Sequence, residues 1–164
     1  AFTDVLDDYV IISGYVAILT GRSRGTEGVD VLIPELFEEA YEAFCERLDD
    51  YWCLNAETGL YGLISDDIPL RFARDGEVLP NFEVKFARDE AERYALENTV
   101  SVRTNQGGLN ISPLALQIAY KIWLGSNKDI EDATYLITVF KDDLDEAALQ
   151  RWGDAFEVDT SGLR

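Results

Sequence analysis

The chain has 164 residues, which suits a single domain, and 47% of them are hydrophobic, enough to build a core. It carries 32 acidic against 14 basic side chains, a formal net charge of −18, and no histidine. The lack of histidine excludes the common Ser–His–Asp and Cys–His triads, so catalysis would have to use carboxylates, Lys, Tyr or a metal ion.

No apolar run approaches the roughly 18 residues of a membrane span, and no basic region precedes an apolar one at the N-terminus. Neither a membrane partner nor a signal peptide is therefore expected, and the expected location is cytoplasmic. In a reducing cytoplasm the two cysteines, Cys45 and Cys53, are expected to be buried free thiols.

The acidic residues are spread along the whole chain rather than gathered in a tail. At low salt such a charge repels nucleic acid, and no DNA partner is expected. In molar salt the Debye length falls to about 3 Å, so the charge does not exclude an RNA partner. Many acids with only four lysines resemble the proteins of salt-in halophiles, the alternative being an ordinary acidic cytosolic protein.

Hydrophobic periodicity divides the chain into alternating β and α segments, followed by a helical last third. The predicted elements are a strand at 9–13, a helix at 15–20, a strand at 29–33, a helix from 34 to about 49, strands at 51–54, 59–64, 68–73 and 81–87, a helix at 89–97, a strand at 99–104, and helices at about 113–124, 130–140 and 145–156. Pro34 is placed at a first helical position, Asp129 is a candidate helix cap, and Val100 and Val102 are expected to point inward.

This order of elements predicts an α/β (α+β) fold, in which helices flank a small, mixed and twisted sheet. No linker or repeat divides the chain, so a single domain over residues 1–164 is expected. Its sheet-containing core covers about 9–105, and its C-terminal helical part covers about 112–156.

Residues 12–33 hold the most informative pattern. A strand ends at Ser13-Gly14, a short helix and a Gly/Arg/Ser/Thr loop follow, and Asp30 then lies inside the next apolar strand. An acid among Val, Leu and Ile costs free energy unless something such as a metal ion compensates it. Glu27 is out of phase with Asp30 in a regular strand, unless a bulge at Gly28 turns it inward.

This segment resembles the motif of the nucleotidyltransferase superfamily, in which a Gly-Ser or Ser-Gly turn follows one strand and an acid–apolar–acid triplet lies on the next. Ser13 and Gly14 match the turn, Asp30 matches the second acid, and Gly28 stands where the first acid belongs. Glu83, on the strand predicted at 81–87, matches the third acid. The resemblance implies that Asp30 and Glu83 are catalytic and hold Mg²⁺, and that Ser13 and Gly14 contact a triphosphate.

The segment SPLALQIAYKIWLGSNKDIEDATYL (Ser112–Leu136) resembles the C-terminal part of a nucleotidyltransferase subgroup that includes abortive-infection toxins. Lys121, Lys128, Asp129 and Asp132 match that pattern, and the resemblance implies nucleotide or phosphate contacts for the two lysines. From the residues alone, Lys121 is the only charge in its predicted helix and either snorkels or faces an anion. Lys128 is either a phosphate contact or a solvated residue beside a helix cap.

The resemblance implies Mg²⁺-dependent transfer of a nucleoside monophosphate from a nucleoside triphosphate to a hydroxyl of a protein, an RNA or a small molecule. Two Mg²⁺ ions about 4 Å apart clamp the attacking and leaving oxygens in such chemistry. Arg22 and Arg24 either contact the triphosphate or RNA, or balance nearby acids.

Gly28 leaves a second hypothesis open, because two acids hold metal less well than three. In that reading the chain is a nucleotidyltransferase-fold binding or regulatory module that has lost full catalysis, in a toxin–antitoxin or defence pair. A third hypothesis is an acidic α/β domain in which Asp30 and Glu83 are surface acids; carboxylates more than about 8 Å apart could not share one metal.

Overall fold

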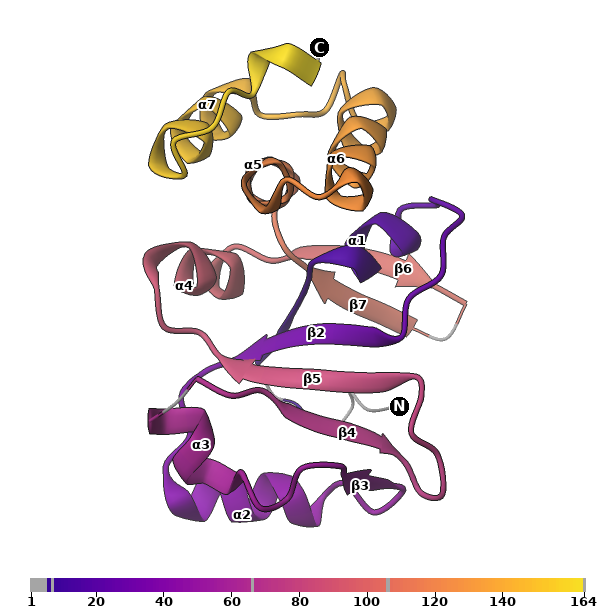
Figure 1. The fold of residues 1–164 in the computed structure, drawn as a ribbon, viewed down its shortest axis with the longest axis vertical. Helices are drawn as coiled ribbons and strands as arrows, with labels where there is room; N and C mark the ends of the chain where they lie inside the picture. The colour runs from indigo at the N-terminus through magenta and orange to yellow at the C-terminus, as the bar shows by residue number, and fades with distance from the viewer. Residues whose placement is uncertain (1–5, 7, 66, 106, 164) are drawn as a thin grey trace.

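The computed structural model describes residues 6, 8–65, 67–105 and 107–163, which form a mixed sheet flanked by helices (Figure 1). The elements are β1 (Val10–Ile12), α1 (Gly14–Leu19), β2 (Gly28–Ile33), α2 (Glu38–Glu46), β3 (Tyr51–Cys53), α3 (Gly59–Ser65), β4 (Leu70–Arg74), β5 (Asn81–Phe86), α4 (Glu90–Glu97), β6 (Val100–Thr104), β7 (Gly107–Ile111), α5 (Leu114–Leu124), α6 (Asn127–Val139) and α7 (Glu146–Ala155), with a 3₁₀ turn at Ser161–Leu163.

The described residues form a seven-stranded sheet with the order β3-β4-β5-β2-β1-β7-β6. β2 runs parallel to β5 and β1 runs parallel to β7, whereas the other neighbouring strands are antiparallel. The predicted class, α/β (α+β) with a mixed sheet between helices, is confirmed.

The alternation of side chains along β2 assigns the two faces of the sheet. Val29, Val31 and Ile33 belong to a core that also contains Phe44 of α2, while Leu32 points the other way and packs with residues of α5 to α7. Figure 1 accordingly shows α2 and α3 gathered at one end of the molecule and α5, α6 and α7 at the other. Asp30 is in phase with Leu32, so it lies on the face that the C-terminal helices approach.

Two predicted elements differ in kind or in bounds. Residues 59–64, predicted as a strand, are the helix α3, in which Leu60 packs against the core while Tyr61 is 76% exposed. Periodicity in so short an apolar run does not separate strand from helix. The helix predicted from Pro34 begins only at Glu38, where two glutamates in the first turn complement the helix dipole.

One strand was not predicted, and two further expectations are wrong. The strand β7 was not predicted, because its sequence GGLNI begins with two glycines and alternates only over its last three residues. Val100 is 42% exposed rather than inward, because β6 is an edge strand of the sheet. The cap of α6 is Ser126, whose hydroxyl accepts from the N–H of Asp129, so Asp129 lies within the first turn.

Cys45 and Cys53 are free but only half-buried, against the expectation of full burial, and burial raises the pKa of both thiols. Within the ranges described above, no helix combines the length and apolar character needed to cross a membrane.

Candidate functional site

Two carboxylates lie side by side on the face of the sheet that carries Leu32. Asp30 of β2 and Glu83 of β5 are register partners in the parallel pair, so both side chains leave the sheet on the same side. Neighbouring strands lie about 4.8 Å apart, which brings the two carboxylates within reach of one ligand. The hypothesis of two unrelated surface acids is therefore disfavoured.

The electrostatics of this pair are unbalanced. Burial raises the pKa of Asp30, the negative charge of Glu83 raises it further, and the Ser13 hydroxyl and nearby lysines oppose the shift. Glu83 also meets Arg71 of β4, whose Nε lies 3.3 Å from Oε1 of Glu83. Lys85, which shares this face, lies 3.1 Å from a carboxylate oxygen of Asp67 instead.

The place of the first acid is taken by Gly28, whose register partner on β5 is Asn81. Pairing of β2 with β5 continues without interruption from Gly28 to Ile33, so no bulge turns Glu27 inward, and Glu27 is an exposed residue before the strand. A Cβ atom at position 28 would lie 3.1 Å from Oδ1 of Asn81 and 3.7 Å from Cγ of Glu83. The amide of Asn81 therefore borders the space that a carboxylate at position 28 would need.

The turn between β1 and α1 is held in a strained conformation. Ser13 has φ 62° and ψ −138°, a region that costs a residue other than glycine about 1–3 kcal/mol. The buried side chain of Gln117 on α5 holds this turn through both of its polar atoms. The Ser13 N–H donates to Oε1 of Gln117 at 3.1 Å, and Nε2 of Gln117 donates to the Ser13 carbonyl oxygen at 3.0 Å.

Lys121, one turn along α5 from Gln117, is 3% exposed and faces anions of its own chain. Its Nζ lies 2.5 Å from Oδ1 of Asp129, 3.4 Å from Oδ2 of Asp132, and 3.5 Å from the Ser13 hydroxyl. Burial alone would raise the pKa of Asp129, but the hydrogen bonds from Lys121 and Ser126 outweigh it and lower that pKa. Lys121 therefore faces anions instead of snorkelling.

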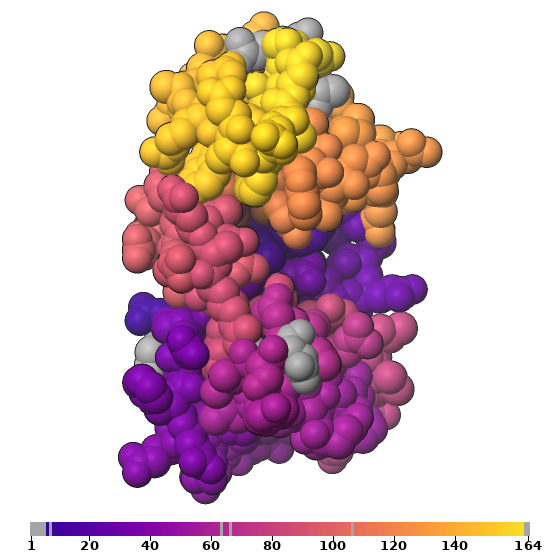
Figure 2. Space-filling view, turned by 60° about the vertical axis from the view of Figure 1, so that its left-hand side comes forward, coloured from indigo at the N-terminus to yellow at the C-terminus, as the bar shows by residue number. Residues whose placement is uncertain are grey.

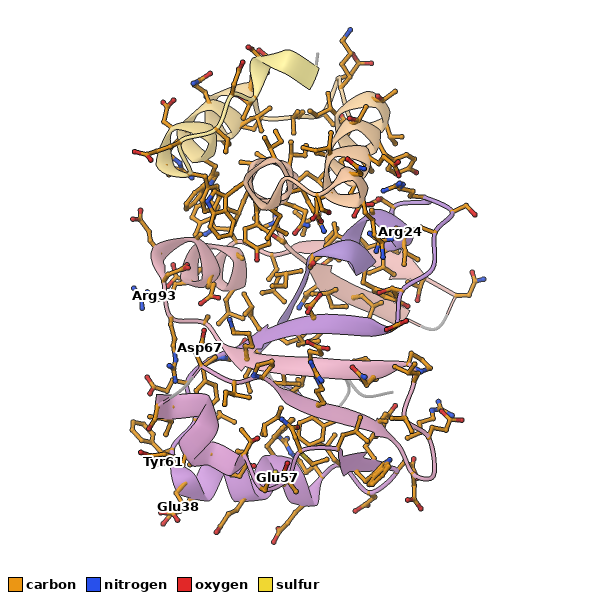
Figure 3. The ribbon with its side chains drawn as sticks, viewed as in Figure 1. Arg24, Glu38, Glu57, Tyr61, Asp67 and Arg93 are labelled. Atoms are coloured by element: carbon orange, nitrogen blue, oxygen red, sulfur yellow. The ribbon has the colours of Figure 1, made fainter. Side chains whose placement is uncertain are left out.

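Arg22 and Arg24 from the loop after α1 reach the same acids. Both guanidinium groups pair with Asp132, which has no exposed side-chain surface, and Arg22 also meets Glu131 at 2.6 Å. Arg24 lies between α1 and α6 (Figure 3), against Gly14, where a Cβ would come within 2.9 Å of its Nη1. A side chain at position 14 would therefore displace the end of the flexible Arg24 side chain.

We refer to five of these residues as the α6 cluster, because their charges meet at the first turns of that helix: Arg22, Arg24, Lys121, Asp129 and Asp132. The structure therefore shows both arginines balancing acids of the chain. Their predicted contacts with a nucleotide, like those of Ser13, Gly14 and Lys121, stay predictions.

The two β-strand acids border a polar hollow of about 470 Å³, within the range of about 300–1,000 Å³ for small-molecule sites. Its lining residues come from the loop before β2, the two strands and α6: Gly25, Thr26, Glu27, Gly28, Asp30, Glu83 and Lys128. The side chain of Lys128 is exposed, so it stands at the rim of the hollow and is not buried in the α6 cluster. Figure 2 shows indigo atoms of the N-terminal segment between orange atoms of the C-terminal part above and magenta atoms below.

A second, smaller cavity of about 100 Å³ is also bordered by the two acids. It joins the β1–α1 turn to α4 and α5, and its polar lining residues are Ser13, Asp30, Glu83, Lys85, Glu92 and Tyr120. Asp30 and Glu83 thus line both the hollow and this cavity.

The sequence matches no protein-family model, and the comparison with curated proteins finds no match. Solved structures do match. An antigenic nucleotidyltransferase-like protein from Paracoccidioides brasiliensis has a TM-score of 0.56 and 17% identity, over 95% of this chain and 88% of the other. The antibiotic-resistance factor ANT(2″)-Ia has a TM-score of 0.56 and 14% identity, over 95% of this chain and 87% of the other.

These likenesses define the class of fold. The chain has the fold of nucleotidyltransferase-like proteins, as the Ser-Gly turn and the acids on two strands had indicated.

The resemblance of residues 12–33 to the nucleotidyltransferase motif implies Mg²⁺, and the donor set suits that ion. In the part of the chain that the structure describes, no three side chains of Asp, Glu, Cys or His come together as metal ligands. Two carboxylates are nonetheless enough, because Mg²⁺ commonly keeps several waters and uses one or two carboxylates together with substrate phosphates. Asp30 and Glu83, adjacent on one face with mutual repulsion, fit this requirement.

Two residues of the site were missed by sequence reasoning, and the role of a third was not predicted. Gln117 and Asn81 are single polar residues inside otherwise ordinary patterns, and nothing in the sequence pairs them with Ser13 or Gly28. Asp132 was noted only as a match to a motif, although it binds three cations and has the most buried carboxylate of the site. The signal available for Asp132 was its position on the same helix face as the apolar residues Ala133, Leu136 and Ile137.

Proposed function

We propose that this chain binds a nucleoside triphosphate with Mg²⁺ and transfers a nucleoside monophosphate to a hydroxyl of a protein, an RNA or a small molecule in the cytoplasm. The observation that carries the proposal is the register pairing of Asp30 with Glu83 at the edge of a polar hollow, in a chain with this fold. Two adjacent oxygen donors with unbalanced charge suit a divalent cation better than they suit a stable core.

Each residue has a definite role in this proposal. Asp30 and Glu83 hold Mg²⁺, which when bound neutralises charge that develops on the phosphates. The first residues of α1 after Ser13 offer backbone N–H groups to the triphosphate, Ser13 offers its hydroxyl, and Lys128 meets the triphosphate from the rim of the hollow. Phosphate contacts by Arg22 or by Lys121 require that these cations leave acids of the α6 cluster.

Calorimetric titration with the four nucleoside triphosphates, with and without Mg²⁺, tests the proposal, followed by a label-transfer assay. We expect binding that depends on Mg²⁺ and is lost in Asp30→Asn. The matched control is Glu27→Gln, because Glu27 lines the same hollow but lies outside the strand pairing. Because of the net charge of −18, titrations from about 0.1 M to about 1 M KCl separate screened from specific binding. Binding that is absent at every salt concentration, or unchanged in Asp30→Asn, contradicts the proposal.

A second candidate function is a binding or regulatory module with reduced catalysis, as in a toxin–antitoxin or defence pair. Two observations favour it: the acid is missing at position 28, and acids of α6 already engage Arg22, Arg24 and Lys121. In that case nucleotide binds but no label is transferred, and Gly28→Asp gains metal affinity or activity. Transfer by the unmodified protein at the rate of a three-acid enzyme excludes this second function.

A further inference from the structure

We propose that the side-chain oxygen of Asn81 is the third protein ligand of a divalent-cation site formed with Asp30 and Glu83. The inference rests on the proposed function, because it concerns the same site. In this arrangement a neutral oxygen donated from β5 replaces the carboxylate that is absent from position 28 on β2.

The first observation is an unpartnered buried oxygen. Asn81 is 8% exposed, and its Oδ1 has no hydrogen-bond partner among the described residues. Its Nδ2 donates to the carbonyl oxygen of Val78 at 3.4 Å, so the amide is anchored on one side only. A buried carbonyl oxygen without a partner costs free energy, and a bound cation would remove that cost.

The second observation is the position of that oxygen. Asn81 and Glu83 are two residues apart on β5, so their side chains share a face, and Asn81 is the register partner of Gly28. The place of a Cβ atom on residue 28 is 3.1 Å from Oδ1 of Asn81 and 3.7 Å from Cγ of Glu83. Because residue 28 is glycine, no side-chain atom occupies this position, and the amide oxygen of Asn81 faces it.

The donor chemistry is consistent with such a site. Carboxylate and amide oxygens are ligands for hard divalent cations such as Mg²⁺, Mn²⁺ and Ca²⁺. Exchanging one carboxylate for an amide lowers the negative charge of the ligand set by one. The cation is then held less tightly by the protein alone, and an incoming polyphosphate meets less repulsion.

Titration of the full chain with Mn²⁺, followed by the loss of the free-ion electron paramagnetic resonance signal, tests the inference without an activity assay. We expect Asn81→Ala to weaken Mn²⁺ binding about ten-fold and the isosteric Asn81→Asp to strengthen it by a similar factor. Gly28→Ala is expected to weaken binding as well, because its methyl group would press on Oδ1 of Asn81. Circular dichroism of each variant verifies that it is folded, and Asn81→Asp keeps the test valid where Asn81→Ala does not fold.

The outcomes separate this inference from the proposed function. Mn²⁺ binding that is lost in Asp30→Asn but unchanged in Asn81→Ala and in Asn81→Asp overturns the role of Asn81 and leaves the proposed function intact. Binding that depends on both Asp30 and Asn81 without nucleotide transfer supports the inference and contradicts catalysis. No saturable Mn²⁺ binding to the unmodified protein, with or without a non-hydrolysable nucleoside triphosphate, overturns both.

Discussion

The α6 cluster and the Asp30–Glu83 pair are both built from charges at least partly removed from water, but only the first is balanced. In the α6 cluster Asp132 meets three cations and Asp129 meets Lys121. In the pair, two acids face each other across parallel strands, and within the described residues only Glu83 has an ion pair, with Arg71. A balanced cluster stabilises the fold, whereas an unbalanced pair stores the free energy that a bound cation would recover.

The largest effect is expected from breaking the α6 cluster at its centre. Asp132→Ala would leave three cations without their shared acid, and removal of one partner from a buried ion pair costs about 3–5 kcal/mol. Urea unfolding at fixed KCl measures the loss. Glu131→Ala is the control, because that side chain is 67% exposed and should change stability by less than about 1 kcal/mol. Equal effects of the two substitutions would show that the cluster is not what holds α6.

The next largest loss of stability is expected from removing the hydrogen bonds between Gln117 of α5 and the strained turn at Ser13. Gln117→Ala leaves the N–H and C=O of Ser13 without partners, which costs about 1–3 kcal/mol. The same substitution at Gln150, exposed on α7, is the control and should lie within about 0.5 kcal/mol of the unmodified protein. Chemical denaturation compares the two variants. If Gln117→Ala also leaves nucleotide affinity unchanged, the Ser13 turn does not bind the triphosphate.

A smaller change, a gain instead of a loss of stability, is expected from a substitution in the Asp30–Glu83 pair. The pKa of Asp30 is raised in the folded state, so its stabilising contribution is complete below the unfolded value of 3.8 and is lost as pH rises through the folded pKa. Asp30→Asn is therefore expected to raise the free energy of unfolding at pH 7 by about 1 kcal/mol, with a difference that disappears below pH 3.8. Thermal unfolding across this pH range, without divalent cations, measures it. A loss of stability at pH 7 would mean that Asp30 is a structural acid.

The smallest change in the free energy of unfolding is expected from the corresponding Asp-to-Asn substitution in the α6 cluster. The pKa of Asp129 is lowered in the folded state, so its contribution is present above the unfolded value of 3.8 and is lost as pH falls through the folded pKa. Asp129→Asn should lower stability at pH 7 by less than about 1 kcal/mol, because Asp132 still faces Lys121. Thermal unfolding over the same pH range measures both variants. If Asp30→Asn and Asp129→Asn change stability at pH 7 in the same direction, the two regions do not differ in the balance of their charges.

Much of this site could be predicted from local pattern. The phases of Asp30 and Glu83 on their strands follow from strict alternation, because side chains on a strand repeat every two residues. The Ser-Gly turn and the apolar helix with a single Lys were also visible in the sequence. The helix α3 and the strand β7 could not be predicted in the same way, since a short apolar run and a glycine-rich run carry no clear period.

The sequence by itself therefore determined the strand phases of Asp30 and Glu83 and the isolated charge of Lys121, through the alternation of strands and the rarity of charge in apolar segments, but it did not indicate Asn81 or Gln117. Only the tertiary structure decided how they meet. Strand order sets Asp30 beside Glu83 and Gly28 beside Asn81, and helix packing closes acids of α6 onto Arg22, Arg24 and Lys121. Apart from Lys121 and Asp129, which are eight positions apart, these pairings join residues more than fifty positions apart. No local periodicity encodes them, because they depend on how the whole core is filled.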